Sequence, residues 1–185
     1  MTFENLDIDG LFLIKPDINE DDRGYFFESF RQDLLNQHLG YEINFIQDNE
    51  SKSSQGILRG LHFQIPPFSQ SKLVRVIKGN VLDVAVDIRK SSKTYGQHRA
   101  VKLSGDNKHQ LFIPKGFAHG FIVLSDIAYF SYKVDSLYSP ENERGILYND
   151  DDLKIDWLVD PKNISISQKD SKLPNFKDCE KEFLK

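Results

Sequence analysis

The sequence predicts an all-β protein, an antiparallel sandwich or barrel with one short helix near the N-terminus. Three observations favour this class. Strand-like runs recur about every 10 to 15 residues, turn residues such as Gly, Asn and Pro separate them, and helical periodicity is scarce. Because the mouth of a barrel is a common place for a small-molecule site, this class also indicates where a ligand is expected.

The N-terminal part places the predicted helix between two strands. Residues 11–14 and 43–47 are largely apolar runs that we expect to be strands. Residues 29–40 are expected to form the helix, since Ser29 can cap its start, apolar residues recur along it and Gly40 can end it.

Residues 81–88 give the clearest strand pattern in the chain. Their apolar residues alternate with Asp83 and Asp87, so we expect one buried face and one polar face. Residues 72–77 are a second strand, and the Gly79-Asn80 pair between these two runs is typical of a hairpin turn. Further strands are expected at residues 56–63, 99–103, 110–113, 120–124 and 128–134.

No linker, repeat or low-complexity segment divides the chain, so residues 1–185 are expected to be one domain. After Pro161 the sequence becomes polar, which indicates a tail that covers the barrel. The net charge of −4 argues against a nucleic-acid-binding surface. No apolar run approaches the roughly 18 residues of a membrane helix, and the start is acidic, so we expect a cytoplasmic protein. The single Cys179 lies in a charged stretch and is expected to be a surface thiol.

Two predicted strands carry side chains that are unusual for packing. Arg59 and His62 lie three residues apart, so in a regular strand they would face opposite sides, and Gly60 between them could mark a bulge that redirects one of them. Tyr132 shares a face with Phe130 and is expected to point into the interior. There a phenol can deliver a proton, although the pattern alone favours a packing role with one hydrogen bond.

Residues 114–120 match the P-x-G-x-x-H form of the second sequence motif of cupin barrels, with His119 as the histidine. Metal-binding cupins usually add an H-x-H pair and a Glu in a first motif. The corresponding stretch here is His62-Phe63-Gln64, in which the second His is missing. We therefore expect no metal ion in the site.

Taken together, these residues resemble the dTDP-4-dehydrorhamnose 3,5-epimerase family of nucleotide-sugar biosynthesis, over nearly the whole chain. Each block is short, but their joint order and spacing are specific. The matching blocks are residues 22–28, 47–49, 58–64, 72–75, 83–89, 114–121, 132–133, 138–140 and 167–170.

The resemblance implies a cupin-type jelly-roll barrel and a homodimer in which an N-terminal segment reaches across to the neighbouring subunit. It implies no metal and no cofactor. The reaction it implies is epimerisation at C3 and C5 of dTDP-4-dehydro-6-deoxy-D-glucose, which leads to dTDP-L-rhamnose after a separate reduction.

The resemblance also assigns the acid–base chemistry. His62 is the implied base, and Asp170 holds its ring and favours its protonated form. Tyr132 is the implied acid on the other face of the sugar. Lys72, together with Arg59, would stabilise the enolate that forms when the proton leaves.

Further residues are implied to bind the nucleotide sugar. Arg23 and Arg59 would meet the diphosphate, and Tyr138 would line the pocket near the base or sugar. Asp83 could support His119 as a hydrogen-bond acceptor. The other polar residues implied around the ligand are Glu28, Gln47, Asp48, Asn49, His119, Glu143 and Lys169.

Three other functions stay open at this point. A 3-epimerase acting on the same or a related 4-keto sugar would use the same base and acid. A non-catalytic cupin that binds a nucleotide sugar would keep the cations and could lose the acid–base pair. A metal-dependent cupin oxygenase would need a bound metal.

Overall fold

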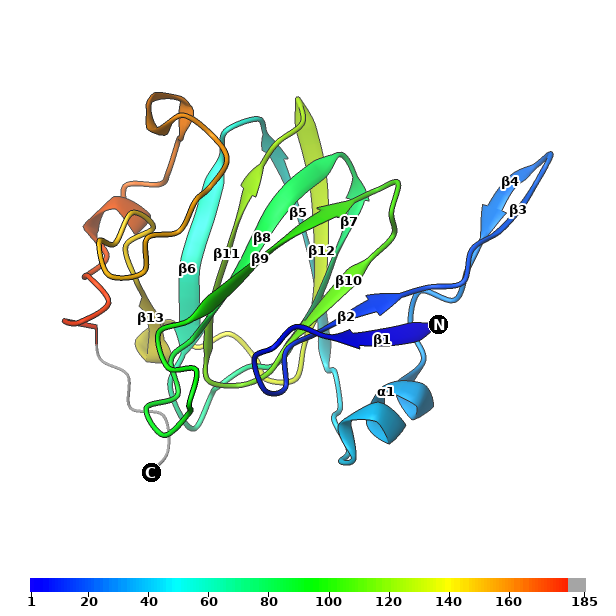
Figure 1. Cartoon of the computed structure of the whole chain (residues 1–185), viewed down its shortest axis with the longest axis horizontal. Helices are drawn as coiled ribbons and strands as arrows, with labels where there is room; N and C mark the ends of the chain where they lie inside the picture. The colour runs from blue at the N-terminus through cyan, green and yellow to red at the C-terminus, as the bar shows by residue number, and fades with distance from the viewer. Residues whose placement is uncertain (180–185) are drawn as a thin grey trace.

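The computed structural model describes residues 1–179, which form two antiparallel sheets that face each other as a barrel (Figure 1). The predicted all-β barrel is confirmed, whereas residues 180–185 of the predicted domain lie outside the described part. The first sheet has the order β1 (Thr2–Asn5), β2 (Phe12–Lys15), β10 (Gln110–Ile113), β7 (Lys72–Lys78), β12 (Ile127–Val134) and β5 (Gln47–Ser54). The second has the order β13 (Glu143–Gly145), β6 (Leu58–Gln64), β11 (Phe117–Val123), β8 (Asn80–Asp87) and β9 (His98–Ser104).

Strand β8 is buried on both faces, so the predicted polar face is buried as well as the apolar one. Its apolar face, with Val84 and Val86, points outward and packs against Trp157 in a second layer. Its other face carries Asp83 and Ala85 toward the barrel interior, where Ala85 joins the core. The alternation of apolar and polar residues therefore predicted the two faces correctly. The outward apolar face does not meet water, because a covering segment packs against it.

The turn at Gly79 is confirmed, but the predicted hairpin is wrong. Strand β7 pairs with β10 and β12, whereas β8 pairs with β9 and β11, so Gly79 carries the chain from one sheet to the other. Its φ is 85°, and a Cβ there would lie 2.1 Å from the carbonyl oxygen of Ile127. Local sequence indicates such a turn but not which sheet the next strand joins.

Strand β5 begins later than expected. Residues 43–46 are irregular, and the strand runs through a polar stretch that pairs with β12 over its whole length. Because it forms one edge of the first sheet and borders a cavity, it lacks the apolar alternation that sequence patterns detect.

Helix α1 (Gln32–Leu39) confirms the predicted helix and its end at Gly40, whose φ of 74° is left-handed. Ser29 is not its cap. Arg31 occupies the N-cap position, and the carbonyl of Ser29 instead accepts a hydrogen bond from Gln110 at 2.7 Å. In the described part of the chain, no helix combines the length and apolar character needed to span a membrane.

The C-terminal segment covers the outer face of the second sheet, as predicted (Figure 1). It includes two short 3-10 helices, η2 (Pro161–Asn163) and η3 (Asp170–Lys172), while a third, η1 (Pro140–Asn142), precedes β13. Trp157 and Phe176 anchor it in the apolar cluster outside the barrel. Cys179 is buried there and its Sγ lies 3.3 Å from the carbonyl oxygen of Gly145, so the expected surface thiol is wrong.

A small hairpin, β3 (Asn19–Asp21) and β4 (Gly24–Phe26), extends away from the barrel (Figure 1). Both of its strands are exposed, and Tyr25 and Phe26 retain 56% and 70% of their accessible surface. A two-stranded hairpin is marginal when it buries so little of its own surface.

Candidate active site

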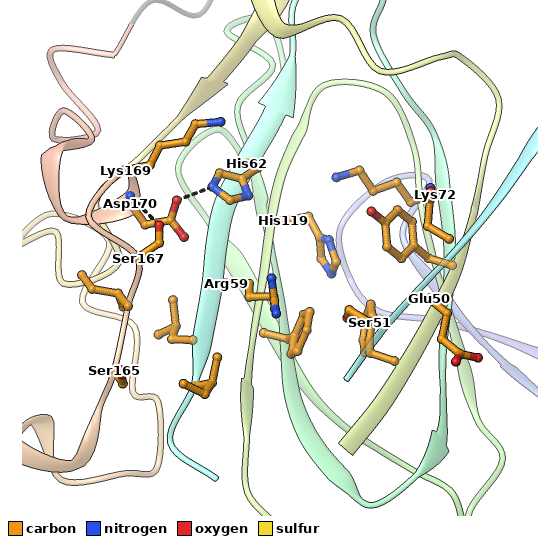
Figure 2. Close-up of a pocket in the computed structure, with 17 residues that line it drawn as sticks. Glu50, Ser51, Arg59, His62, Lys72, His119, Ser165, Ser167, Lys169 and Asp170 are labelled. Carbon is orange, nitrogen blue, oxygen red and sulfur yellow. Dashed lines mark hydrogen bonds and ion pairs between the residues drawn. The ribbon is translucent and has the colours of Figure 1, made fainter. Parts of the chain in front are cut away.

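A cavity of about 630 Å³ opens between the two sheets beside the C-terminal segment (Figure 2). This volume lies in the usual range of small-molecule sites. The first sheet contributes β5, β7 and β12 to its walls, and the second contributes β6 and β11. The predicted site residues that line it are Asn49, Arg59, His62, Lys72, His119, Tyr132, Lys169 and Asp170.

Arg59 and His62 both reach this cavity because β6 is irregular. The register of β6 against β11 shifts close to Gly60, as expected for a bulge. Gly60 has a φ of 125°, and a Cβ there would lie 2.5 Å from the Cα of Gly120. The close approach requires glycine, and the irregularity turns both side chains toward the same space.

His62 forms a hydrogen-bonded pair with Asp170, with 2.8 Å between Nε2 and Oδ1 (Figure 2). Asp170 comes from the start of η3, where its backbone N–H donates to Ser167 Oγ at 3.0 Å. Burial would raise the pKa of Asp170, but the hydrogen bond and charge of His62 and the hydrogen bonds from Gly60 and Ser167 together outweigh it, so the pKa is lowered. Because a carboxylate accepts, Nε2 carries the hydrogen and Nδ1 is left as the basic nitrogen.

Tyr132 and Lys72 lie on the opposite wall, on β12 and β7. Tyr132 packs against the interior cluster, so its predicted inward orientation is confirmed. Burial raises the pKa of Tyr132, with Arg59 opposing part of this rise, so the phenol keeps its proton at neutral pH. Burial lowers the pKa of Lys72 to about 8, against the opposing charges of Asp83 and Glu143. This wall therefore offers both a proton donor and a cation.

His119 occupies the floor between these walls (Figure 2). Its Nε2 lies 2.9 Å and 3.0 Å from the two carboxylate oxygens of Asp83, so the expected support by Asp83 is confirmed. Arg59 lies nearby and donates from Nε to Ser53 Oγ at 3.1 Å.

A second cavity of about 290 Å³ shares Asn49, His62, Lys72 and Tyr132 with the first and contains more of the predicted residues. Tyr138 donates to Glu143 Oε2 at 2.7 Å, and the Lys169 ammonium pairs with the same oxygen. Burial would raise the pKa of Glu143, but the hydrogen bonds from Lys169 and Tyr138 lower it. Gln47 also lines this space and donates to Asn49 at 2.7 Å.

Three predicted residues lie outside both cavities of this chain. Arg23 is on the projecting hairpin, where it pairs with Asp21, and exposed Glu28 follows that hairpin. Asp48 faces the outside of the barrel and pairs with Lys133 at 2.9 Å. Its neighbours Gln47 and Asn49 line the cavities, and because side chains of a strand alternate, Asp48 between them points the other way.

Other lining residues were missed from the sequence. The alternation that turns Asn49 inward could have indicated Ser51 as well. The C-terminal residues carry no periodic pattern that could have placed them. The missed residues are Glu50, Ser51, Ile57, Leu58, Phe121, Phe130, Ser165, Ile166 and Ser167.

An antiparallel barrel with a base, a phenol and a lysine around one cavity defines a cupin-type barrel equipped for acid–base chemistry on a small molecule. Among residues 1–179, no three His, Cys, Asp or Glu side chains are grouped so as to hold a metal ion.

Comparison with known proteins identifies the family. The family model described as dTDP-4-dehydrorhamnose 3,5-epimerase matches residues 5–178. The chain therefore belongs to the dTDP-4-dehydrorhamnose 3,5-epimerase family, and its activity is the epimerisation after which the family is named.

Individual relatives agree with this assignment. The dTDP-4-dehydrorhamnose 3,5-epimerase of Shigella flexneri is 49% identical over 94% of this chain and 95% of its own length. The 3,5-epimerase of Legionella pneumophila, solved with dTDP-4-keto-L-rhamnose, is 47% identical, with a TM-score of 0.92 over 96% of this chain and 93% of that one. A 3'-monoepimerase of Streptomyces bikiniensis is 32% identical, with a TM-score of 0.86 over 94% and 87%.

Proposed function

We propose that the chain inverts C3 and C5 of dTDP-4-dehydro-6-deoxy-D-glucose to give dTDP-4-dehydro-L-rhamnose, with no metal or other cofactor. The observation that carries this proposal is the placement of His62 on one wall and Tyr132 on the other. Both reacting carbons flank the C4 ketone, so loss of either proton gives an enolate. Inversion then requires a proton from the opposite face of the sugar, and a sugar held between the walls has a donor there.

His62 takes the substrate proton through Nδ1, and Asp170 holds the ring through Nε2. The imidazolium that forms is stabilised by the adjacent carboxylate. Tyr132 then donates its phenolic proton to the carbon from the other side. Before the second inversion His62 releases its proton to solvent and Tyr132 regains one, and the same two groups then act once the ring presents the other carbon.

Lys72 stabilises the negative charge that develops on the C4 oxygen. A ketone α-proton is a very weak acid compared with imidazolium, so the enolate needs a preorganised cation in a site of low dielectric constant. Arg59 lines the same cavity, is exposed, and supplies positive charge for the enolate or the diphosphate. Glu143, Lys169, Tyr138 and Gln47 provide the polar groups around the remainder of the nucleotide sugar.

We also propose that the protein is a homodimer in which each hairpin β3–β4 reaches the partner's cavity. Tyr25 and Phe26 expose apolar surface on a hairpin that projects from its own barrel (Figure 1). The side chain of Arg23 is 90% exposed, far more than expected for a diphosphate ligand within its own chain. In the dimer, Arg23 and Glu28 would complete the neighbouring site.

Complementation between two inactive variants tests the dimer. We expect Arg23→Ala and His62→Ala each to lose activity, whereas co-expression of the two should restore part of it. A mixed dimer contains one site with both residues intact. Absence of restored activity, despite mixed dimers isolated through two different affinity tags, would contradict the shared site.

Proton NMR of the substrate in deuterated water tests the reaction. The purified protein with a chelator, and without nicotinamide or metal, should introduce deuterium at C3 and C5, and His62→Ala should not. His98→Ala, a histidine on β9 outside both cavities, serves as the control and should retain exchange. Exchange confined to C3 would indicate a 3-epimerase, and binding without exchange would indicate a sugar-nucleotide-binding cupin. Activity that appears when a metal is restored would revive the metal-dependent alternative.

A further inference from the structure

The cavity contains a second His–Asp pair that the proposed acid–base steps do not use. His119 of β11 is the direct cross-strand partner of His62 of β6, so the two imidazoles lie on neighbouring strands. Asp83 of β8 lies behind His119 and has no accessible surface, and His119 retains 7%. Both carboxylate oxygens of Asp83 lie within hydrogen-bond distance of the same ring nitrogen, Nε2.

A carboxylate in the interior of a barrel is costly unless it is paired. The core around Asp83 is apolar and includes Val81 and Ala85 of the same strand. In the described part of the chain, His119 is the hydrogen-bond partner of its side chain. The position of Asp83 therefore makes sense as a support for this imidazole and not as a general structural contact.

The pairing fixes which nitrogen of His119 carries hydrogen. A carboxylate has acceptor oxygens and no proton to give, so Nε2 is the N–H and donates to Asp83. The other nitrogen, Nδ1, has no protein partner in the described part of the chain. Within residues 1–179, Ser69 Oγ is the one buried side-chain atom that lacks a hydrogen-bond partner. Because Nδ1 of His119 lacks a partner but does not belong to this buried group, it is accessible, and it faces the cavity that His119 lines.

The surroundings keep this ring neutral. Burial lowers the pKa of His119, Asp83 opposes the change, and the positive charge of Lys72 and the charge that His62 gains on protonation lower the pKa further. These groups come from β7, β8 and β6, the strands that surround the ring. A neutral ring with hydrogen on Nε2 presents a bare lone pair at Nδ1.

We propose that Asp83 is a positioning residue for the epimerisation: it holds His119 in the tautomer whose Nδ1 accepts a hydrogen bond from a ring hydroxyl of the sugar. An acceptor cannot bind the C4 oxygen, the enolate or a phosphate, which all need donors. The substrate offers hydroxyl donors at C2 and at C3, and C3 is next to the ketone. His119 therefore orients the ring through one of them, while Lys72 receives the C4 oxygen. This inference rests on the proposed function for the identity of the sugar.

The tautomer can be measured without substrate. In protein labelled with ¹⁵N, long-range proton–nitrogen correlations of the His119 ring should show hydrogen on Nε2 and none on Nδ1. The isosteric Asp83→Asn variant, whose amide can donate as well as accept, should lose this strict preference. A wild-type ring with hydrogen on Nδ1, or an unchanged pattern in Asp83→Asn, would overturn the proposal. Neither result depends on catalysis, so a failure of this proposal can be distinguished from a failure of the proposed epimerisation.

The hydroxyl is identified with substrate analogues that lack either the C2 or the C3 hydroxyl, with exchange at C5 as the readout. The wild-type protein should discriminate against one analogue by about 3- to 10-fold in kcat/KM, the usual value of one neutral hydrogen bond. Asp83→Asn should reduce that ratio toward one, since its ring no longer presents a fixed acceptor. Equal ratios in the wild type and the variant for both analogues would contradict the positioning role. Thermal unfolding of both proteins controls for simple loss of structure.

Discussion

Two His–Asp pairs stand side by side in the barrel and differ in depth. The side chain of His62 is 27% exposed, whereas that of His119 is 7% exposed and its carboxylate partner is fully buried. Asp170 comes from the covering segment, 108 residues away along the chain, whereas Asp83 is built into strand β8. The comparison teaches that the same chemical pair fits two tasks of the proposed mechanism. The shallow pair is open to solvent, as proton transfer requires, and the deep pair is shielded, as a fixed hydrogen-bond acceptor requires.

The largest expected effect is a loss of activity that differs between the His62 and His119 variants. His62→Ala should reduce kcat by about 10²- to 10⁴-fold, the usual range for loss of a general base. His119→Ala should cost about tenfold or less, because it removes a hydrogen bond and leaves the proton transfers intact. Deuterium exchange at C3 and C5 measures both variants. Equal losses would mean that the deeper histidine also transfers protons.

Tyr132→Phe tests the proposed proton donor on the wall opposite the His62–Asp170 pair. We expect inversion to fall by about 10²- to 10³-fold, because the phenolic proton is lost while the ring is kept. His62 would still remove the substrate proton and return one to the same face. Deuterium should therefore enter at C3 with retained configuration, which NMR coupling constants distinguish from inversion. If retained exchange falls as much as inversion does, the phenol acts in the first step as well.

Much of this arrangement could be predicted from residue patterns. The inward orientation of Tyr132 followed from alternation in its strand, and the bulge beside His62 followed from Gly60. The pairing of His62 with Asp170 could not follow from any local pattern, because the covering segment lacks periodicity. It came from the resemblance to a family.

The missed elements share a physical cause. Strand β5 is polar because it is an edge strand beside a cavity, so it lacks the apolar period that identifies strands. The hairpin β3–β4 buries little of its own chain, so its sequence carries no core pattern. The two faces of β8 were found, but which one borders the interior depends on the covering layer and not on the strand itself.

The pH dependence of kcat tests whether the charge of the buried Lys72 supports the proton transfer at His62. Burial lowers the pKa of Lys72 to about 8, so the ammonium form is lost as the pH rises through this value. We expect kcat to fall about tenfold per pH unit above pH 8. Lys72→Arg keeps its charge at these pH values and should remove this limb, even if its activity at neutral pH is lower. The raised pKa of Tyr132 places its own ionisation at higher pH. A limb near pH 8 that survives in Lys72→Arg would contradict the assignment.

The smallest expected effect concerns how the two carboxylates are held. Asp83 is fixed by the strand pairing of β8 on both sides, whereas Asp170 lies in the covering segment, where one of its contacts is local, from its backbone N–H to Ser167 Oγ at 3.0 Å. Ser167→Ala removes a contact worth about 0.5–1.5 kcal/mol, so kcat should fall about 2- to 10-fold with KM nearly unchanged. Ser171→Ala is the matched control, because its hydroxyl bonds the carbonyl of Gln168 in the same exposed segment and does not touch Asp170. An equal loss in both variants would mean that the segment as a whole, and not this hydrogen bond, sets the position of the carboxylate.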